Sequence, residues 1–185
     1  MIALALAGGA LLGILSRAEE VTPGLSLGLS SDSAWVAAAF AVGARAHGWR
    51  GAALLSTGTM CAANGGYYAW IVLTEPGTPL VAAAGDPWAW VVAGVLTGVV
   101  FGVAGRLWGV SPPLGRLAAV TPLAMVLAIE GGDALRGGAP TEAIGLAVAL
   151  ALPVVSAPSR RWPALATSAA LAVLAACGAG AALLP

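Results

Sequence analysis

Long apolar segments, separated by short polar turns, recur along the whole chain and restrict it to one class of fold. Hydrophobic residues make up 59% of the 185 positions and charged residues only 9%, whereas a soluble domain carries about 25% charged residues. A membrane-spanning helix needs about 20 predominantly apolar residues. We therefore predict an all-α protein, a polytopic membrane helical bundle that forms a single domain over residues 1–185.

We expect about seven transmembrane helices. Their approximate ranges are 1–16, 34–46, 51–73, 88–107, 114–129, 141–155 and 162–184. The first range is short and is followed by a polar stretch, 17–33, so six spans result if the first segment lies in the interface. Because no basic residue precedes its apolar core, we interpret this segment as a first span and not as a signal peptide. The fifth helix either ends near Ile129 or continues to Leu135.

Local signals indicate where one helix begins and how another packs. The run Ser31-Asp32-Ser33 is typical of an N-cap for the second helix.

Gly94, Gly98 and Gly102 recur at every fourth position of the fourth helix. Small residues at this spacing let helix backbones approach closely in lipid. We interpret this row of glycines as a packing seam.

The charged residues sort by turn and predict the orientation of the bundle. The turns after the second, fourth and sixth helices hold Arg45, Arg50, Arg106, Arg116, Arg160 and Arg161. The opposite side holds Glu19, Glu20, Asp32, Glu75, Asp86, Asp133 and Glu142. By the positive-inside rule the arginine-rich turns are cytoplasmic, which leaves the N-terminus outside. Arg17 and Arg136 depart from this rule, and we expect them to pair with acids on the outer face.

Composition also indicates the setting of the protein. All eight basic residues are arginine, in a chain rich in alanine and glycine, which is typical of a high-GC bacterium. We expect a multi-pass protein of the bacterial cell membrane, with the lipid bilayer as its surroundings. The formal net charge is zero, so there is no electrostatic case for binding nucleic acid.

One acid stands out because it lies within an apolar run. Glu130 falls in the segment 123–135, ahead of two glycines and a second acid, Asp133. An ionisable side chain inside a membrane costs roughly 2.5–3.5 kcal/mol and therefore suggests a function. A rise of about 1.5 Å per residue from Arg116 puts Glu130 in the outer half of the bilayer core. The rival interpretation places Glu130 at a helix end that the two glycines break, paired with an arginine such as Arg136.

Polar and aromatic residues of other helices fall at the same depth. Asn64, Tyr67 and Tyr68 have the spacing i, i+3, i+4 and so share one helix face. We predict an outer-half cavity lined by Asp32, Trp35, Asn64, Tyr67, Tyr68, Trp88, Glu130 and Asp133. Simpler interpretations stay open, because Trp and Tyr collect at membrane interfaces in any case. Asp32 is equally well explained as a helix cap.

This set of residues fits proton-initiated cyclisation of a terpene. A buried carboxyl has a raised pKa and can donate a proton to an epoxide or an alkene. Aromatic faces stabilise the resulting cation by about 0.5–2 kcal/mol each, and a second carboxylate or a tyrosine can remove the final proton. We assign catalytic roles to Glu130, Asp32, Asp133 and Tyr67, and substrate binding to Trp35, Asn64, Tyr68, Trp70 and Trp88. No DDxxD pattern is present, so we expect no metal and no cofactor.

Four short motifs carry a resemblance to known families. They are SDSAW at 31–35, GGYYAW at 65–70, GVVFGVAGRLW at 98–108 and AIEGG at 128–132. The chain resembles a family of small, mostly uncharacterised actinobacterial membrane proteins. Its plan is also similar to that of the small integral-membrane terpene cyclases of bacterial indole-terpenoid and fungal meroterpenoid pathways. That resemblance implies a lipophilic prenylated substrate, no metal, and a pair of essential acids, for which Glu130 and Asp32 are the matching positions.

Two other functions stay open. In a small transporter or channel, Glu130 and Asp133 would bind a proton or a cation, although the sequence contains no inverted repeat. In an accessory membrane protein, the glycine seam would serve packing alone. A cyclase predicts a closed, aromatic-lined cavity that holds Glu130, whereas a transporter predicts access from both faces of the membrane.

Overall fold

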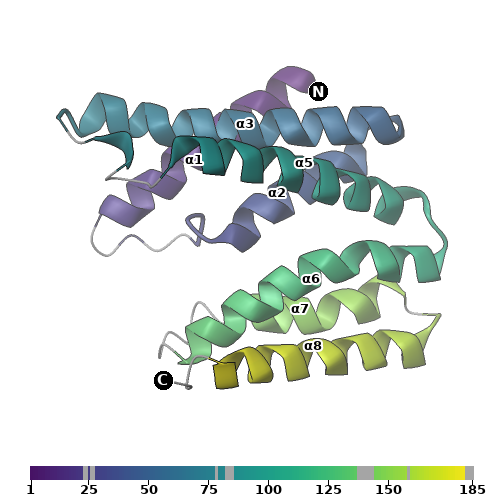
Figure 1. Ribbon diagram of the computed structural model, residues 1–185. Coiled ribbons are helices and arrows are strands. Elements are labelled where there is room, and N and C mark those ends of the chain that lie inside the picture. Colours follow the sequence, from purple (N-terminus) through teal and green to yellow (C-terminus); the bar gives the residue numbers. More distant parts are fainter. Residues whose placement is uncertain are drawn as a thin grey trace. The chain divides into compact units, whose positions relative to one another are not determined.

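The computed structural model describes residues 1–22, 25, 28–77, 79–81, 86–136, 144–157 and 159–181. These residues contain helices and no strand, which confirms the predicted all-α fold (Figure 1). The helices given for the described residues are α1 (Ile2–Val21), α2 (Asp32–Arg45), α3 (Gly48–Thr74), α5 (Pro87–Val110), α6 (Pro113–Arg136), α7 (Ile144–Ser156) and α8 (Arg161–Ala181).

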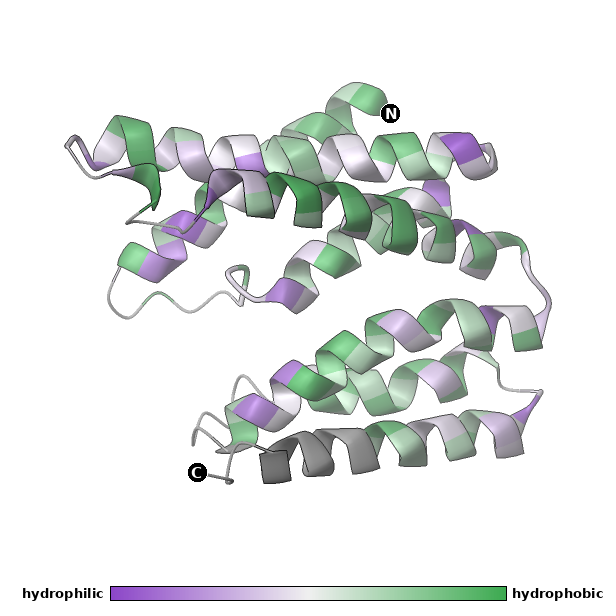
Figure 2. Ribbon diagram, in the orientation of Figure 1, coloured by the Kyte–Doolittle hydropathy of each residue, from purple (hydrophilic) through white to green (hydrophobic). Residues whose placement is uncertain are grey.

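The apolar character of the helices identifies a membrane protein. Three described helices are long and apolar enough to cross a membrane, over Ile2–Val21, Pro87–Val110 and Pro113–Leu135. Figure 2 shows α5 as hydrophobic along most of its length. The longest helix, α3, is not among the three, although the sequence suggested it as a clear span. Polar residues in the middle of α3 make this helix less apolar than those three. Among them, Ser56, Thr59 and Asn64 are buried within the protein.

The first helix is longer than we expected. The sequence suggested an end near Ser16, but α1 continues through Arg17, Glu19 and Glu20 to Val21. That expectation was wrong because tertiary hydrogen bonds stabilise these charged side chains on the helix. The second helix begins as predicted: Ser31 is its N-cap, and the Ser31 hydroxyl oxygen accepts a hydrogen bond from the backbone N–H of Ala34 at 3.3 Å.

The chain falls into two compact units, Met1–Arg106 and Leu107–Pro185, and each is described by itself. The prediction of a single domain stays a prediction. In the first unit, α1 crosses α3 in close contact (Figure 1). A Cβ atom on Gly13 would lie 1.8 Å from the carbonyl oxygen of Ala63, and one on Gly66 would lie 2.1 Å from that of Ala10. Only glycine fits this interface.

The glycine row of α5 packs against α3 and α2. A Cβ atom on Gly98 would lie 2.4 Å from Cα of Thr57 on α3. Another on Gly43 of α2 would lie 2.1 Å from the carbonyl oxygen of Gly102. Both approaches are far closer than side chains allow, which confirms the interpretation of the row as a packing seam.

The second unit consists of α6, α7 and α8. Small apolar residues fill its interior, where Ala124, Ala128, Ala149 and Leu171 form one buried cluster. The helix α6 continues through Gly131 and Gly132 to Arg136, so the two glycines do not break it. A Cβ atom on Gly131 would lie 2.5 Å from the backbone nitrogen of Leu146, so this glycine allows α6 and α7 to approach closely.

Candidate functional site

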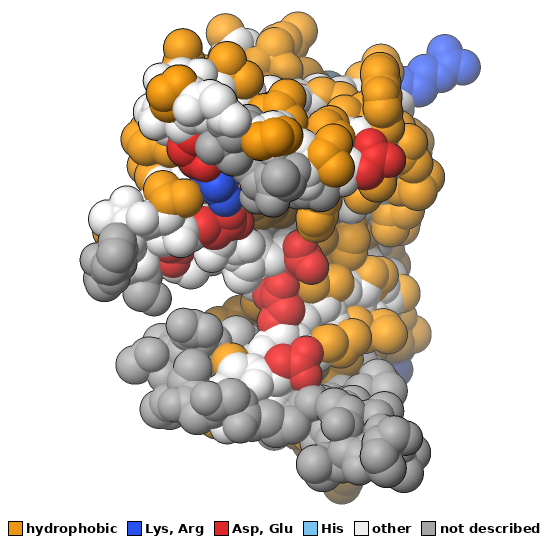
Figure 3. Space-filling model, turned by 60° about the vertical axis from the view of Figure 1, so that its left-hand side comes forward, with side chains coloured by type: hydrophobic (Ala, Val, Ile, Leu, Met, Phe, Trp, Pro, Cys, Tyr) orange, Lys and Arg blue, Asp and Glu red, His pale blue; other side chains and the backbone are white. Residues whose placement is uncertain are grey.

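Charged and aromatic side chains from three helices meet at one end of the first unit. We define the Arg17 cluster as Arg17, Glu20, Trp35, Tyr67, Tyr68 and Glu75. The C-terminal ends of α1 and α3 and the N-terminal end of α2 bring these residues together. Figure 3 shows acidic and basic side chains gathered on this face of the unit.

Arg17 is the centre of the cluster and is held by two carboxylates. Its Nε and Nη2 atoms donate to Oε1 and Oε2 of Glu75 at 2.9 and 2.7 Å. Its Nη1 atom donates to Oε2 of Glu20 at 3.0 Å. The Arg17 side chain is 11% exposed. This confirms the expectation that Arg17 pairs with acids.

Three aromatic rings pack against one another beside Arg17. The rings of Trp35 and Tyr67 have centroids 6.4 Å apart and planes inclined at 66°. Those of Tyr67 and Tyr68 lie 5.6 Å apart at 74°. Both pairs have the edge-to-face geometry that aromatic quadrupoles prefer. The guanidinium carbon of Arg17 lies 5.7 Å from the centre of the Tyr67 ring, so this ring already interacts with a positive charge.

The Tyr67 hydroxyl joins the aromatic rings to the ionic pairs. It donates a hydrogen bond of 2.5 Å to Oε2 of Glu20, the same oxygen that accepts from Arg17. The neighbouring Tyr68 hydroxyl is buried and has no hydrogen-bond partner among the described residues, and the same holds for the indole N–H of Trp70. Buried polar groups are normally hydrogen bonded. These two donors are exceptions to that rule within the described residues.

Residues 28–30, which lie shortly before α2, are hydrogen bonded to side chains of α1 and to Trp35 of the cluster. The Glu19 carboxylate accepts hydrogen bonds from the backbone N–H groups of Gly28, Leu29 and Ser30 at 2.7, 2.7 and 3.0 Å. The carbonyl oxygen of Leu29 accepts from the Ser16 hydroxyl at 2.6 Å and from the Trp35 indole at 3.2 Å. This network fixes the position of the Trp35 ring.

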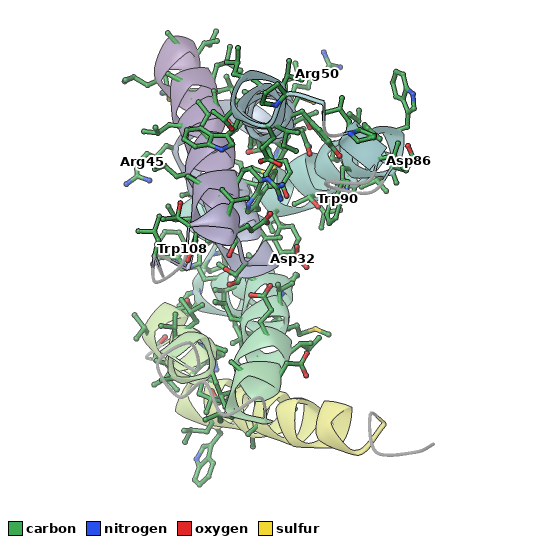
Figure 4. All side chains as sticks on the ribbon, turned by 90° about the vertical axis from the view of Figure 1, so that its left-hand side faces the viewer. Asp32, Arg45, Arg50, Asp86, Trp90 and Trp108 are labelled. Carbon is green, nitrogen blue, oxygen red and sulfur yellow. The ribbon has the colours of Figure 1, made fainter. Side chains whose placement is uncertain are left out.

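Other residues that the sequence suggested lie outside the Arg17 cluster. Asn64 is buried, and its amide donates to the carbonyl oxygens of Met60 and Trp90 at 3.2 and 3.3 Å, so it joins α3 to α5. Trp88 is 76% exposed in the first turn of α5. Asp32 is exposed in the first turn of α2, where the N-cap is its neighbour Ser31 (Figure 4).

Glu130 and Asp133 belong to the second unit. They lie three residues apart on α6, where Glu130 is half-buried and Asp133 is exposed. The other members of the predicted cavity lie in the first unit. Their convergence with Glu130 therefore stays a prediction.

The sequence did not predict the hydrogen bonds by which Glu20 and Glu75 hold Arg17 and Glu19 holds residues 28–30. One signal was present, because Arg17 and Glu20 have the i, i+3 spacing of a helical ion pair. No local signal could have identified Glu75, which lies 58 residues from Arg17 in the sequence.

Glu75 gives the cluster a pH dependence. Hydrogen bonds from Arg17 lower the pKa of the Glu75 carboxyl. Because the pKa is lower in the folded state, this interaction stabilises the fold above the unfolded-state pKa, about 4.3, and is lost as the pH falls through the folded-state pKa. We expect the melting temperature in detergent to drop below about pH 4.3, and to drop less in Glu75→Gln. Parallel pH profiles for the two proteins would contradict this.

Comparison with known proteins gives a family but no activity. The model of a family of unknown function, DUF6518, matches residues 1–185, the whole chain. No curated protein matches the chain, and no solved structure matches it either.

Proposed function

We propose that this chain, which belongs to the family of unknown function DUF6518, is a membrane enzyme that cyclises a prenyl-type chain without a metal ion. The observation that supports this is the edge-to-face packing of Trp35, Tyr67 and Tyr68 beside a carboxylate. Aromatic faces stabilise a carbocation without trapping it, and a carboxylate is a base that can end the reaction.

The proposed reaction is an isomerisation. A carboxylic acid, for which the sequence predicts Glu130, protonates the oxygen of a terminal epoxide or a carbon of a terminal alkene. The electron pair of the next double bond then forms a carbon–carbon bond to the cationic carbon. Loss of a proton from carbon restores a double bond, so the product has the mass of the substrate. A second carboxylate or a tyrosine can accept that proton.

Membranes that contain the chain provide the test. They are given a farnesylated aromatic substrate, with or without a terminal epoxide and with or without EDTA. A product of unchanged mass and new retention time, formed in the presence of EDTA and absent from control membranes, is the expected result. A product that EDTA abolishes would contradict a metal-independent mechanism.

The Tyr67 hydroxyl should contribute to turnover. Tyr67→Phe removes the hydrogen bond to Glu20 but keeps the ring. A hydrogen bond to a charged group contributes about 1.5–3 kcal/mol, so we expect turnover to fall at least about tenfold, or the product pattern to change. Tyr68→Phe is the comparison, since it removes a neighbouring hydroxyl that makes no hydrogen bond within the described residues. Unchanged rate and products in Tyr67→Phe would argue against a role for the Tyr67–Glu20 pair.

A proton-coupled carrier is the second candidate. The observation that favours it is the continuous network of Glu75, Arg17, Glu20 and Tyr67 at the ends of α1 and α3. Connected ionisable side chains in membrane proteins often serve as proton relays. Liposomes that contain the chain and a pH-sensitive dye would show proton movement in the absence of any cyclised product.

A further inference from the structure

The other end of the first unit carries exposed basic side chains. We define the Arg45–Arg50 patch as Arg45, His47, Trp49 and Arg50, which surround the turn from α2 to α3. Arg45 is the last residue of α2, Arg50 lies in the first turn of α3, and all four side chains are exposed. The side chains of Arg45 and Arg50 point away from the helices (Figure 4).

Within the first unit, no described acid lies near this patch. Every Asp and Glu of residues 1–106 lies at the opposite end of the unit: Glu19, Glu20, Asp32, Glu75 and Asp86. The hydrogen bond of Arg45 is a long one, 3.5 Å to the carbonyl oxygen of Ala41 in its own helix. The two guanidinium groups therefore have N–H donors that can bind a group outside the protein.

The patch lies where a membrane surface is expected. Arg106, near the C-terminal end of the membrane-length helix α5, donates to the carbonyl oxygen of Ala46 at 3.0 Å, so the patch and that helix end lie together. Trp49 is 48% exposed between the arginines. Indole rings favour the headgroup level of a bilayer.

We propose that the Arg45–Arg50 patch binds the headgroup of an anionic phospholipid such as phosphatidylglycerol. The planar guanidinium fork matches two phosphate oxygens, and the net negative charge of this lipid complements the patch. Phosphatidylcholine also carries a phosphate, but its choline cancels the charge. This inference does not depend on the proposed enzymatic function.

Native mass spectrometry of the purified full chain tests the proposal. Phosphatidylglycerol or phosphatidylcholine is titrated into wild type, Arg45→Gln/Arg50→Gln and Arg45→Lys/Arg50→Lys. We expect wild type to prefer phosphatidylglycerol, and the Gln variant to bind it about fivefold more weakly per arginine removed. The Lys variant should keep most of the preference. Arg116 and Arg160 of the second unit are intact in each variant, so their contribution to lipid binding is constant.

Three results would overturn the proposal. The first is equal binding of both lipids by wild type. The second is unchanged binding of phosphatidylglycerol by the Gln variant. The third is displacement of the lipid by millimolar inorganic phosphate, because that would indicate a site for free phosphate. Arg45→Gln and Arg50→Gln as single variants, checked by melting temperature, separate lost binding from lost folding.

Discussion

Membranes that carry Glu130→Gln should form no cyclised product from a farnesylated substrate that wild-type membranes convert. The amide has nearly the shape of the carboxyl but cannot donate an acidic proton. General acid catalysis contributes about 10²–10⁴-fold, so turnover should fall by at least about a hundredfold. Product formation by liquid chromatography and mass spectrometry gives the rate.

The Glu130 experiment needs controls for folding and for chemistry. Glu130→Asp keeps an acid on a shorter side chain, so it should retain part of the activity. The elution volume and melting temperature of Glu130→Gln should match those of wild type. Full activity in Glu130→Gln would refute the catalytic assignment. Asp32→Asn is a separate variant, for which we expect lower turnover or a changed product.

Gly13→Leu should prevent α1 from docking on α3 and leave little folded protein. Any side chain at this position would overlap the backbone of α3, since its Cβ atom would lie 1.8 Å from the Ala63 carbonyl oxygen. Backbone cannot rotate away as a side chain can, so the cost should reach or exceed the upper end of the usual overpacking range, about 3 kcal/mol. Elution profile and thermal unfolding in detergent measure the loss.

Gly8→Leu is the matched control for this experiment. Gly8 lies on the same helix, and a Cβ atom there would meet nothing within 4 Å. Both substitutions raise helix propensity by similar amounts, so the difference between them isolates the contact with α3. A Gly13→Leu protein as stable as Gly8→Leu would contradict the close packing of α1 on α3.

The sequence by itself determined the fold class and much of the helix layout. Apolar segments with few charges require helices in lipid, because each backbone group must then be hydrogen bonded within its own segment. The Ser31 cap and the α5 glycine row were predicted correctly because both signals are local, namely a polar residue at a helix start and a repeat of four residues.

The tertiary structure alone decided how the charged residues at the end of the first unit are used. Arg17 looked like the start of a polar turn, yet it lies within α1 because Glu75, from the end of α3, neutralises it. Likewise, Asn64 and Tyr67 share a helix face by spacing, but Asn64 bonds to α5 while Tyr67 contacts Arg17 and Trp35. Spacing along one helix predicts the side of the helix on which a residue lies. The residue that it contacts depends on which other helix packs against that side. This packing is decided by contacts between residues far apart in the sequence.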